Sequence, residues 1–232
     1  MDGAQVVGVD GWRDGWVAAA LPGSGSGSPD VVHWRLFPRF ESLLRAYPHA
    51  HVAVDIPLAL PTIGRRLCED EARAFLGSAR SSIFLTPPWW VLTAYRLDGP
   101  HPRGIGVSIQ TWNILPKVHE AMAALAATGH PRVGEVHPEC SFRAMAGATK
   151  GNPGVAAARL ASKKTGRGVG QRLALLRDCA GMTTPDLDTA PAGPGLDDLL
   201  DAVAAAWTAR RWRAASADLI RFGSPASGQI FA

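Results

Sequence analysis

Apolar and polar positions along the first quarter of the chain follow the short-period pattern of β-strands. Runs of apolar and β-branched residues are bounded by polar or glycine-containing turns, and the first two runs are close enough to form a hairpin. These runs predict strands at residues 5–10, 15–21, 31–37 and 51–56. Between the third and fourth runs, Phe40, Leu43, Leu44 and Tyr47 recur at helical spacing. The predicted order is therefore βββαβ.

The fourth run (HVAVDI) is apolar at nearly every position, which is typical of a strand in the middle of a sheet with helices on both faces. Beyond it, apolar spacing predicts helices at residues 66–77, 109–127, 141–145, 170–179 and 196–217, and a further strand at residues 132–136. We expect the second of these helices to bend at Pro116 and the last to be amphipathic and to close the fold. The pattern as a whole predicts an α/β fold with a mixed sheet.

The chain between the fourth and fifth predicted strands is unusually long. Residues 78–103 within it are rich in Pro, Trp and Gly and predict an insertion across the sheet edge or the mouth of a site. The adjacent Trp89 and Trp90 could stack on bases, but packing of the insertion against the core is the commoner role for such a pair. We therefore predict one domain over residues 1–232, with an α-rich insertion and the bent helix at about residues 62–130.

Composition narrows the class of protein. Hydrophobic residues make up 47% of the 232 residues and charged residues 19%, which suits a folded core. The longest apolar run, at residues 202–207, is too short to span a membrane, and no signal peptide is recognisable. Three widely spaced cysteines indicate neither a zinc site nor a disulfide framework, so we expect a cytoplasmic protein. The net charge of +4 permits contact with nucleic acid without requiring it.

Acidic residues lie in the most apolar parts of the chain. They end two predicted strands, lie within a third, and occur twice in the last helix: Asp10, Asp55, Glu135, Asp198 and Asp201. A carboxylate removed from water needs a cation or hydrogen bonds, and carboxylates with water are the ligands of hard cations such as Mg²⁺. If the strands are neighbours, these acids converge on such a site.

Each acid also has a structural interpretation. Asp10 precedes Gly11 and could form a turn, and Asp55 could accept backbone hydrogen bonds. Glu135 could pair with an arginine, and Asp198 could cap its helix. Asp201, which lies one turn inside an apolar helix, is the hardest to explain without a function.

Basic residues offer a counterpart to these acids. Lys163, Lys164 and Arg167 lie in a glycine-containing loop before a predicted helix, which suits phosphate contacts, although a solvated loop is an equal alternative. Four arginines of the insertion and its flanks could line a phosphodiester track, but pairing with the neighbouring Glu69, Asp70 and Glu71 is the commoner arrangement. These arginines are Arg65, Arg66, Arg73 and Arg80.

Several motifs together resemble a bacterial and archaeal family described as a domain of unknown function and predicted to be ribonuclease-H-like nucleases. The motifs are GVDGWRDGWVAA, VAVDIPLALP, RRLCEDEARAFLG, EVHPECSF, SKKTGRGVGQRLALL and DDLLDAVAAAWTA. The resemblance implies a ribonuclease-H-like mixed sheet with helices on both faces. It also implies two Mg²⁺ or Mn²⁺ ions held by acids on the first strand, the fourth strand and the final helix. These positions correspond to Asp10, Asp55 and Asp198 or Asp201.

The expected function is metal-dependent hydrolysis of phosphodiester bonds in DNA or RNA. Asp10 would bridge the ions, Asp55 and Asp201 would complete their coordination, and Asp198 or Glu135 would orient a water molecule. The basic loop would hold the backbone phosphate. Two alternatives stay open: an ATP-binding phosphotransferase of the actin-like branch, and a nucleic-acid-binding or scaffold protein without catalysis. No membrane contact is expected, and a dimer is compatible with the sequence.

Overall fold

Seven strands form one mixed sheet in the computed structural model, which describes residues 6–22, 31–95, 99–102, 104, 106–148 and 160–232. The strand order is β3-β2-β1-β4-β5-β7-β6. The strands are β1 Val6–Trp12, β2 Gly15–Leu21, β3 His33–Phe37, β4 His51–Val54, β5 Val133–Val136, β6 Arg221–Ser224 and β7 Gly228–Phe231. β1 to β3 are antiparallel neighbours, β1, β4, β5 and β7 run parallel, and β6 pairs antiparallel with β7.

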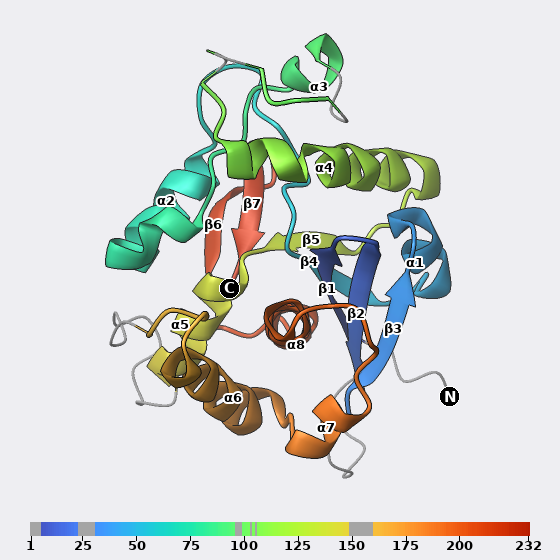
Figure 1. Cartoon of the computed structure of the whole chain (residues 1–232), viewed down its shortest axis with the longest axis vertical. Helices are drawn as coiled ribbons and strands as arrows, with labels where there is room; N and C mark the ends of the chain where they lie inside the picture. The colour runs from blue at the N-terminus through green and yellow to red at the C-terminus, as the bar shows by residue number, and fades with distance from the viewer. Residues whose placement is uncertain (1–5, 23–30, 96–98, 103, 105, 149–159) are drawn as a thin grey trace.

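Helices cover both faces of this sheet. They are α1 Phe40–Ala46, α2 Leu67–Leu76, the 3₁₀ helix η1 Gly77–Ser82, α3 Val91–Ala94, α4 Ile109–Thr128, α5 Pro138–Ala148, α6 Gly166–Ala180, α7 Thr184–Asp188 and α8 Leu196–Arg213. In Figure 1, α1 and α4 lie on one side of the sheet, and α8 lies on the other with α5, α6 and α7 beyond it. The predicted α/β class, the βββαβ order and the ribonuclease-H-like mixed sheet are therefore confirmed.

Strand alternation divides the core into two layers. Val7 and Val9 of β1 pack with α1 and α4, whereas Val6 packs in the layer that contains α8. The side chains of β4 alternate in the same way. Val52 and Val54 pack in the layer with α1 and α4, and Ala53 packs in the layer with α8. Successive side chains of a strand point to opposite faces, so even positions of β1 face α8.

The expectation of an amphipathic closing helix is wrong. Residues 199–209 of α8 are all buried, because the sheet covers one side of the helix and α5 and α6 cover the other. A helix buried all round lacks a polar stripe. The helix ends at Arg213, and the unpredicted hairpin β6–β7 follows and extends the sheet beyond β5.

The long connection between β4 and β5 contains α2, η1, α3 and α4. α2 packs against the β6–β7 hairpin at one edge of the sheet (Figure 1), and α4 runs unbroken through Pro116. Two of the four arginines pair with neighbouring acids as expected, Arg65 with Asp70 and Arg66 with Glu69, whereas Arg73 donates to the carbonyl of Ile83. Trp90 packs against Tyr95, although both it and Trp89 are exposed.

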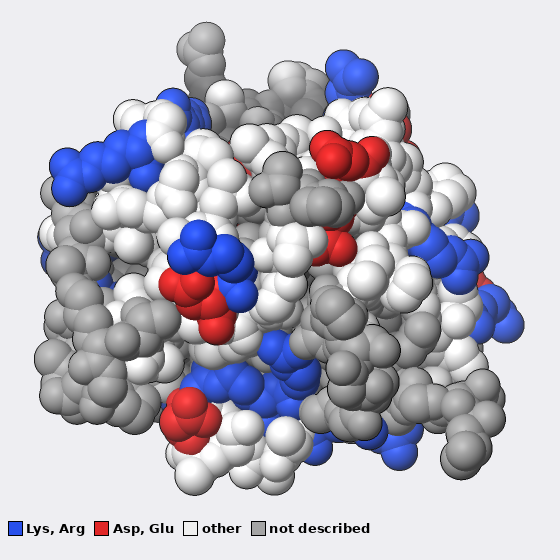
Figure 2. All heavy atoms as spheres, turned by 90° about the horizontal axis from the view of Figure 1, so that it is seen from below, with Lys and Arg blue, Asp and Glu red and all other residues white. Residues whose placement is uncertain are grey.

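The surface carries charges of both signs. Seen from below the view of Figure 1, basic and acidic side chains are interspersed among uncharged residues (Figure 2), in keeping with the mild net charge. In the described part of the chain, no helix combines the length and apolar character that crossing a membrane requires.

Candidate metal centre

Strand register places two aspartates side by side at one edge of the sheet. β1 and β4 are parallel neighbours with Val9 opposite Val54, and the N–H of Asp55 donates to the carbonyl of Val9 at 3.0 Å. Asp55 therefore continues the register beside Asp10 at the C-terminal end of β4. By strand alternation, both side chains belong to the face that α8 covers.

A glycine brings α8 onto that face. A Cβ atom at Gly8 would lie 2.0 Å from the carbonyl oxygen of Ala202 and 2.1 Å from the backbone nitrogen of Ala206. The backbones of β1 and α8 are therefore in direct contact, which no residue with a side chain would permit. Asp201, which is only 5% exposed, is adjacent to this contact in α8 and thus faces the strand ends.

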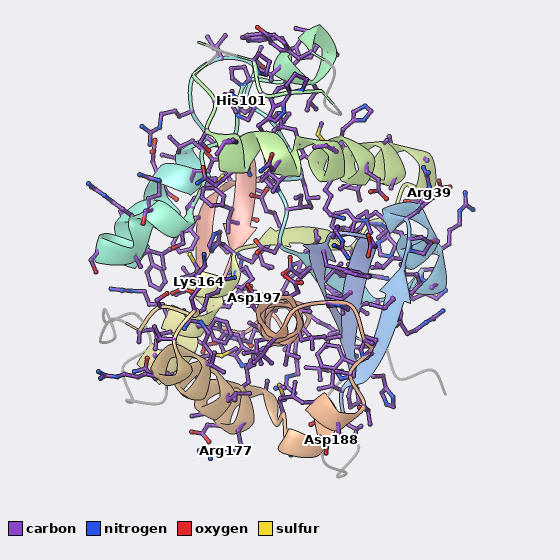
Figure 3. All side chains as sticks on the ribbon, in the orientation of Figure 1. Arg39, His101, Lys164, Arg177, Asp188 and Asp197 are labelled. Carbon is purple, nitrogen blue, oxygen red and sulfur yellow. The ribbon has the colours of Figure 1, made fainter. Side chains whose placement is uncertain are left out.

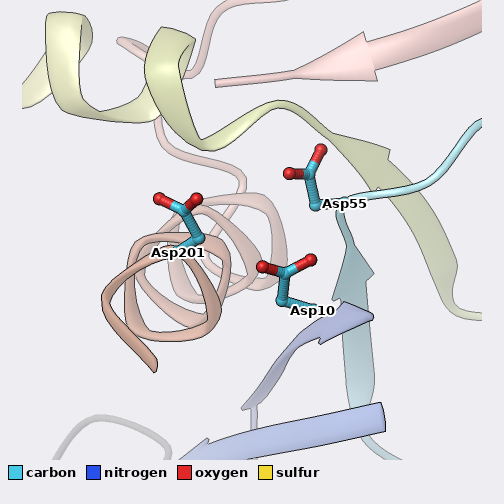
Figure 4. Close-up of side chains that lie close together, drawn as sticks. All are labelled: Asp10, Asp55 and Asp201. Carbon is cyan, nitrogen blue, oxygen red and sulfur yellow. The ribbon is translucent and has the colours of Figure 1, made fainter. Parts of the chain in front are cut away.

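The structure brings these three carboxylates together. Asp10, Asp55 and Asp201 each offer an oxygen, and these three oxygens lie within 4.8 Å of one another (Figure 4). We call this group the aspartate cluster. It contains the three residues for which metal binding was expected from the sequence.

Burial and neighbouring negative charges raise the pKa values of the three carboxyl groups in the aspartate cluster. Burial, together with the charges of Asp55, Asp201 and Asp198, raises the pKa of Asp10 well above its ordinary value. Burial raises the pKa of Asp55 to about 7, against the opposing charge of Lys163. Burial also raises the pKa of Asp201 to about 6, again against Lys163 and with a contribution from Asp55. The like charges favour a cation among them.

Two lysines flank the cluster. Lys163 Nζ lies 2.6 Å from Asp201 Oδ2, and although burial lowers the pKa of Lys163, the carboxylates of Asp201, Asp10 and Asp197 together raise it above its ordinary value. Lys117 Nζ donates to the carbonyl of Gly15 at 2.7 Å and lies 4.6 Å from the centre of the Trp16 ring. Burial lowers the pKa of Lys117, against the attraction of Glu120 and Asp10.

Asp198 has the capping role that was one of its two interpretations. Its Oδ2 accepts the backbone N–H of Gly195, the N-cap of α8, at 2.9 Å. Asp197 lies beside it in the first turn. Asp198 is nevertheless close enough to Asp10 to raise the pKa of that residue.

Glu135 does not join the cluster. It is buried and paired with Arg66, at 2.9 Å from Nη1 and 2.6 Å from Nη2, and it also accepts the N–H of Leu58 at 3.0 Å. Its neighbour Val136 packs in the α8 layer, so alternation directs Glu135 to the other face of β5. The alternative interpretation, pairing with an arginine, is the one observed.

His137 lies between β5 and α5, and its position in the sequence favours a hydrogen-bonded loop residue. Its Nε2 lies 3.2 Å from the carbonyl of Ser82, and its Nδ1 is buried with no hydrogen-bond partner in the described part of the chain. Burial lowers the pKa of His137, so the ring is neutral at neutral pH. The available signal was its position between two acids in the EVHPE run.

A cavity of about 730 Å³ connects these groups. The aspartate cluster, His137, Lys163 and Lys164 line it, and residues 78–84 of the insertion form part of its wall. The insertion therefore contributes to the mouth of the site.

The basic loop precedes α6, which begins at Gly166 instead of the expected residue 170. Thr165 caps this helix by accepting the N–H of Gly168 at 3.1 Å. Lys164 and Arg167 are exposed. In Figure 3, Lys164 lies on the side of α8 where α5 and α6 lie, and Asp197 lies in the first turn of α8. Of the three basic residues, only Lys163 contacts the cluster.

The mixed sheet of this order is a ribonuclease-H-like fold, and the three acids of the cluster come from β1, the end of β4 and α8. The chain belongs to the family described as "Protein of unknown function (DUF429)", whose model matches residues 8–223. A solved structure of Thermus thermophilus RuvC is similar to this chain with a TM-score of 0.41 and 14% identity, over 91% of this chain and 97% of that one. No curated protein matches the chain.

Proposed function

We propose that this protein is a divalent-cation-dependent nuclease that hydrolyses phosphodiester bonds of nucleic acid. The observation that carries the proposal is the aspartate cluster, with three carboxylate oxygens within 4.8 Å in a cavity large enough for a phosphate group. A stable fold gains nothing from crowding three such groups. Function is the simplest reason to retain them.

The residues fit a hard divalent cation. All three donors are carboxylate oxygens, which Mg²⁺ and Mn²⁺ prefer over softer ligands. Their spacing needs only a small contraction to surround one ion, because oxygens bound to Mg²⁺ at about 2.1 Å lie at most about 4.2 Å apart. Asp10, Asp55 and Asp201 would hold the metal. When bound, it would stabilise negative charge on the attacking and leaving oxygens of a phosphodiester.

The protein's own residues would orient the substrate. Lys164 lines the cavity, and Arg167 is exposed in the first turn of α6, so both can contact backbone phosphates without reading sequence. Lys163 lies between them and the cluster. Nucleic acid is the polymer whose repeating phosphates match this arrangement of cations beside carboxylates.

The two remaining acidic candidates, Asp198 and Glu135, differ in how many of their carboxylate oxygens are already hydrogen-bonded. Asp198 uses one oxygen as a helix cap and keeps the other for a water molecule near Asp10, so we retain it as the residue that orients water. Both oxygens of Glu135 are bound by Arg66, which favours a structural role for that carboxylate.

The test is a cleavage assay with labelled single-stranded, duplex, hybrid and junction substrates, in Mg²⁺, Mn²⁺ or EDTA. We expect cleavage that EDTA abolishes and that Asp10→Asn reduces by at least about 100-fold. The matched control is Asp188→Asn, an exposed acid of α7 far from the site (Figure 3), which should cleave like the wild type. Cleavage unaffected by EDTA or by Asp10→Asn would contradict the proposal.

Melting temperatures separate this proposal from its alternatives. Millimolar Mg²⁺ or Mn²⁺ should raise the melting temperature of the wild type, and Asp10→Asn should lose that gain. A shift that needs ATP as well as metal would indicate the phosphotransferase alternative. The absence of any metal-dependent shift would indicate a protein that binds without catalysis.

A further inference from the structure

We infer that Lys163 occupies the place of a second cation, so that the aspartate cluster holds one divalent ion and not two. This inference rests on the proposed function and specifies the metal content of the same site. It replaces the two-ion arrangement expected from the sequence. Three observations carry it: the fixed position of Lys163, the shortage of free carboxylate oxygens, and the charge balance.

Lys163 is held in place by its loop. Thr165 donates both its N–H, at 3.0 Å, and its hydroxyl, at 2.8 Å, to the carbonyl of Ser162. Ala161 donates its N–H to the side chain of Gln171, and its carbonyl accepts Arg172 at 2.9 Å. The loop is therefore tied to α6 on both sides of Lys163.

The ammonium group accordingly has a fixed target. It lies 2.6 Å from Asp201 Oδ2, and the Asp201 side chain is only 6% exposed, so little water competes for that oxygen. Such a charge-assisted hydrogen bond in a partly buried site is strong. Lys163 thus blocks one oxygen of the cluster.

Oxygens for a second ion are scarce. Asp10 Oδ1 accepts the N–H of Gly11 at 2.7 Å, which uses part of the residue that would have to bridge two ions. The neighbouring acids are also engaged, because Asp198 caps α8 and Glu135 pairs with Arg66. Glu139 is bound by Arg172 at 2.7 and 2.8 Å. Two ions about 3.5–4 Å apart need shared carboxylates, and hydrogen bonds already engage one oxygen each of Asp10, Asp201 and Asp198.

The balance of charges in the site also indicates one divalent ion. The aspartate cluster and Asp198 provide four carboxylates, and Lys163 and Lys117 provide two ammonium groups, which leaves an excess of two negative charges. Asp197 lies 3.8 Å from Lys163 but is half exposed, so water screens it. One divalent ion neutralises the site. A second would make it strongly positive before any substrate binds.

Mn²⁺ bound to the full chain tests this inference by two readouts that do not depend on activity. Equilibrium dialysis counts the bound ions, and electron paramagnetic resonance distinguishes an isolated Mn²⁺ from a magnetically coupled pair. We expect one uncoupled Mn²⁺ in the wild type, which Asp10→Asn abolishes. Lys163→Met removes the ammonium group at similar size and should admit a second, coupled ion. Lys163→Arg keeps the charge and should stay at one.

Lys164→Met is the matched control, because Lys164 is the next residue in the same loop and is exposed. It should bind one ion like the wild type. A coupled pair in the wild type overturns the inference even if Lys163→Met fails to fold, and so does a folded Lys163→Met protein that still binds one ion. Absence of any Mn²⁺ sensitive to Asp10→Asn would instead overturn the proposed function.

Discussion

Replacing Asp55 with asparagine should stabilise the metal-free protein at alkaline pH. Asp55 is partly buried beside Asp10, and burial, with a smaller contribution from the charge of Glu135, raises its pKa from 3.8 to about 7. Folding at high pH therefore forces a negative charge into a site that resists it. Asparagine has nearly the same shape and carries no charge, so the variant avoids this cost while keeping the packing.

The magnitude follows from the difference in pKa between the unfolded and folded chain. A difference of about three pH units, at about 1.4 kcal/mol each, makes the ionised carboxylate cost about 4 kcal/mol of folding free energy. That cost is a large fraction of the free energy of unfolding of a typical domain, which is about 5–15 kcal/mol. The Asp55→Asn variant loses the attraction between the Asp55 carboxylate and Lys163. The raised pKa of Asp55 already includes that attraction, so the cost needs no further correction for it.

The sign of the pH dependence is opposite to that of a salt-bridged acid. Below pH 3.8 Asp55 is protonated in both states and contributes nothing. Between 3.8 and about 7 the folded state binds the proton more tightly, so stability falls as the pH rises through this window. Above about 7 the whole cost is present. The advantage of Asp55→Asn should grow over this window and then level off.

The assay is urea denaturation of both proteins in EDTA at pH 5, 6, 7 and 8.5, with free energies extrapolated to water. Asp188→Asn, at an exposed position, controls for the general loss of one carboxylate. Saturating Mg²⁺ should narrow the difference, because the wild type gains about 2.7 kcal/mol at 100 times the dissociation constant and the variant loses a ligand. An Asp55→Asn protein that is less stable at every pH in EDTA would refute the reasoning.

Further substitutions test three separate parts of the structure. Gly8→Ala should destabilise the protein by at least about 3 kcal/mol in denaturation experiments, because it separates β1 from α8, whereas Gly170→Ala, whose Cβ meets open space, should be neutral or stabilising. Arg66→Ala should cost about 3–5 kcal/mol because it leaves a buried carboxylate unpaired, and an unchanged melting temperature would contradict that pairing. The double change Lys164→Ala and Arg167→Ala should flatten the log–log salt dependence of nucleic-acid binding by about 0.7–0.9 per lost contact and leave metal binding intact.

The first half of the fold could be predicted because its information is local. Alternation and turn residues mark β1, β2 and β4; β1 pairs with β2 across a short turn, and β4 pairs with β1 after the short segment that contains β2, β3 and α1. The hairpin β6–β7 gave no comparable signal. Its strands have four residues each and mix Arg221, Ser224 and Gln229 with apolar residues; β6 is the edge strand of the sheet, and both strands pack against α2.

Long-range pairing explains which parts of the site the sequence could not show. The approach of Asp201 to Asp10 could be expected, since a buried acid in an apolar helix needs partners. The position of Lys163 against Asp201 and the pairing of Arg66 with Glu135 depend on how loops return to the sheet across 38 and 69 residues of sequence. Residue types and spacing carry no information on such contacts.

The close approach of α8 to the sheet also explains why the cluster contains only aspartates. Gly8 lets the backbones of β1 and α8 touch, so side chains that meet beside this contact have room for one methylene group each. A glutamate at these positions would carry its carboxylate past the meeting point or push the helix away. The longer acids of this region, Glu135 and Glu139, lie outside the cluster, and each meets the long side chain of an arginine. The glycine in the first strand therefore determines both the distance between the secondary-structure elements and the kind of acid that can form the site.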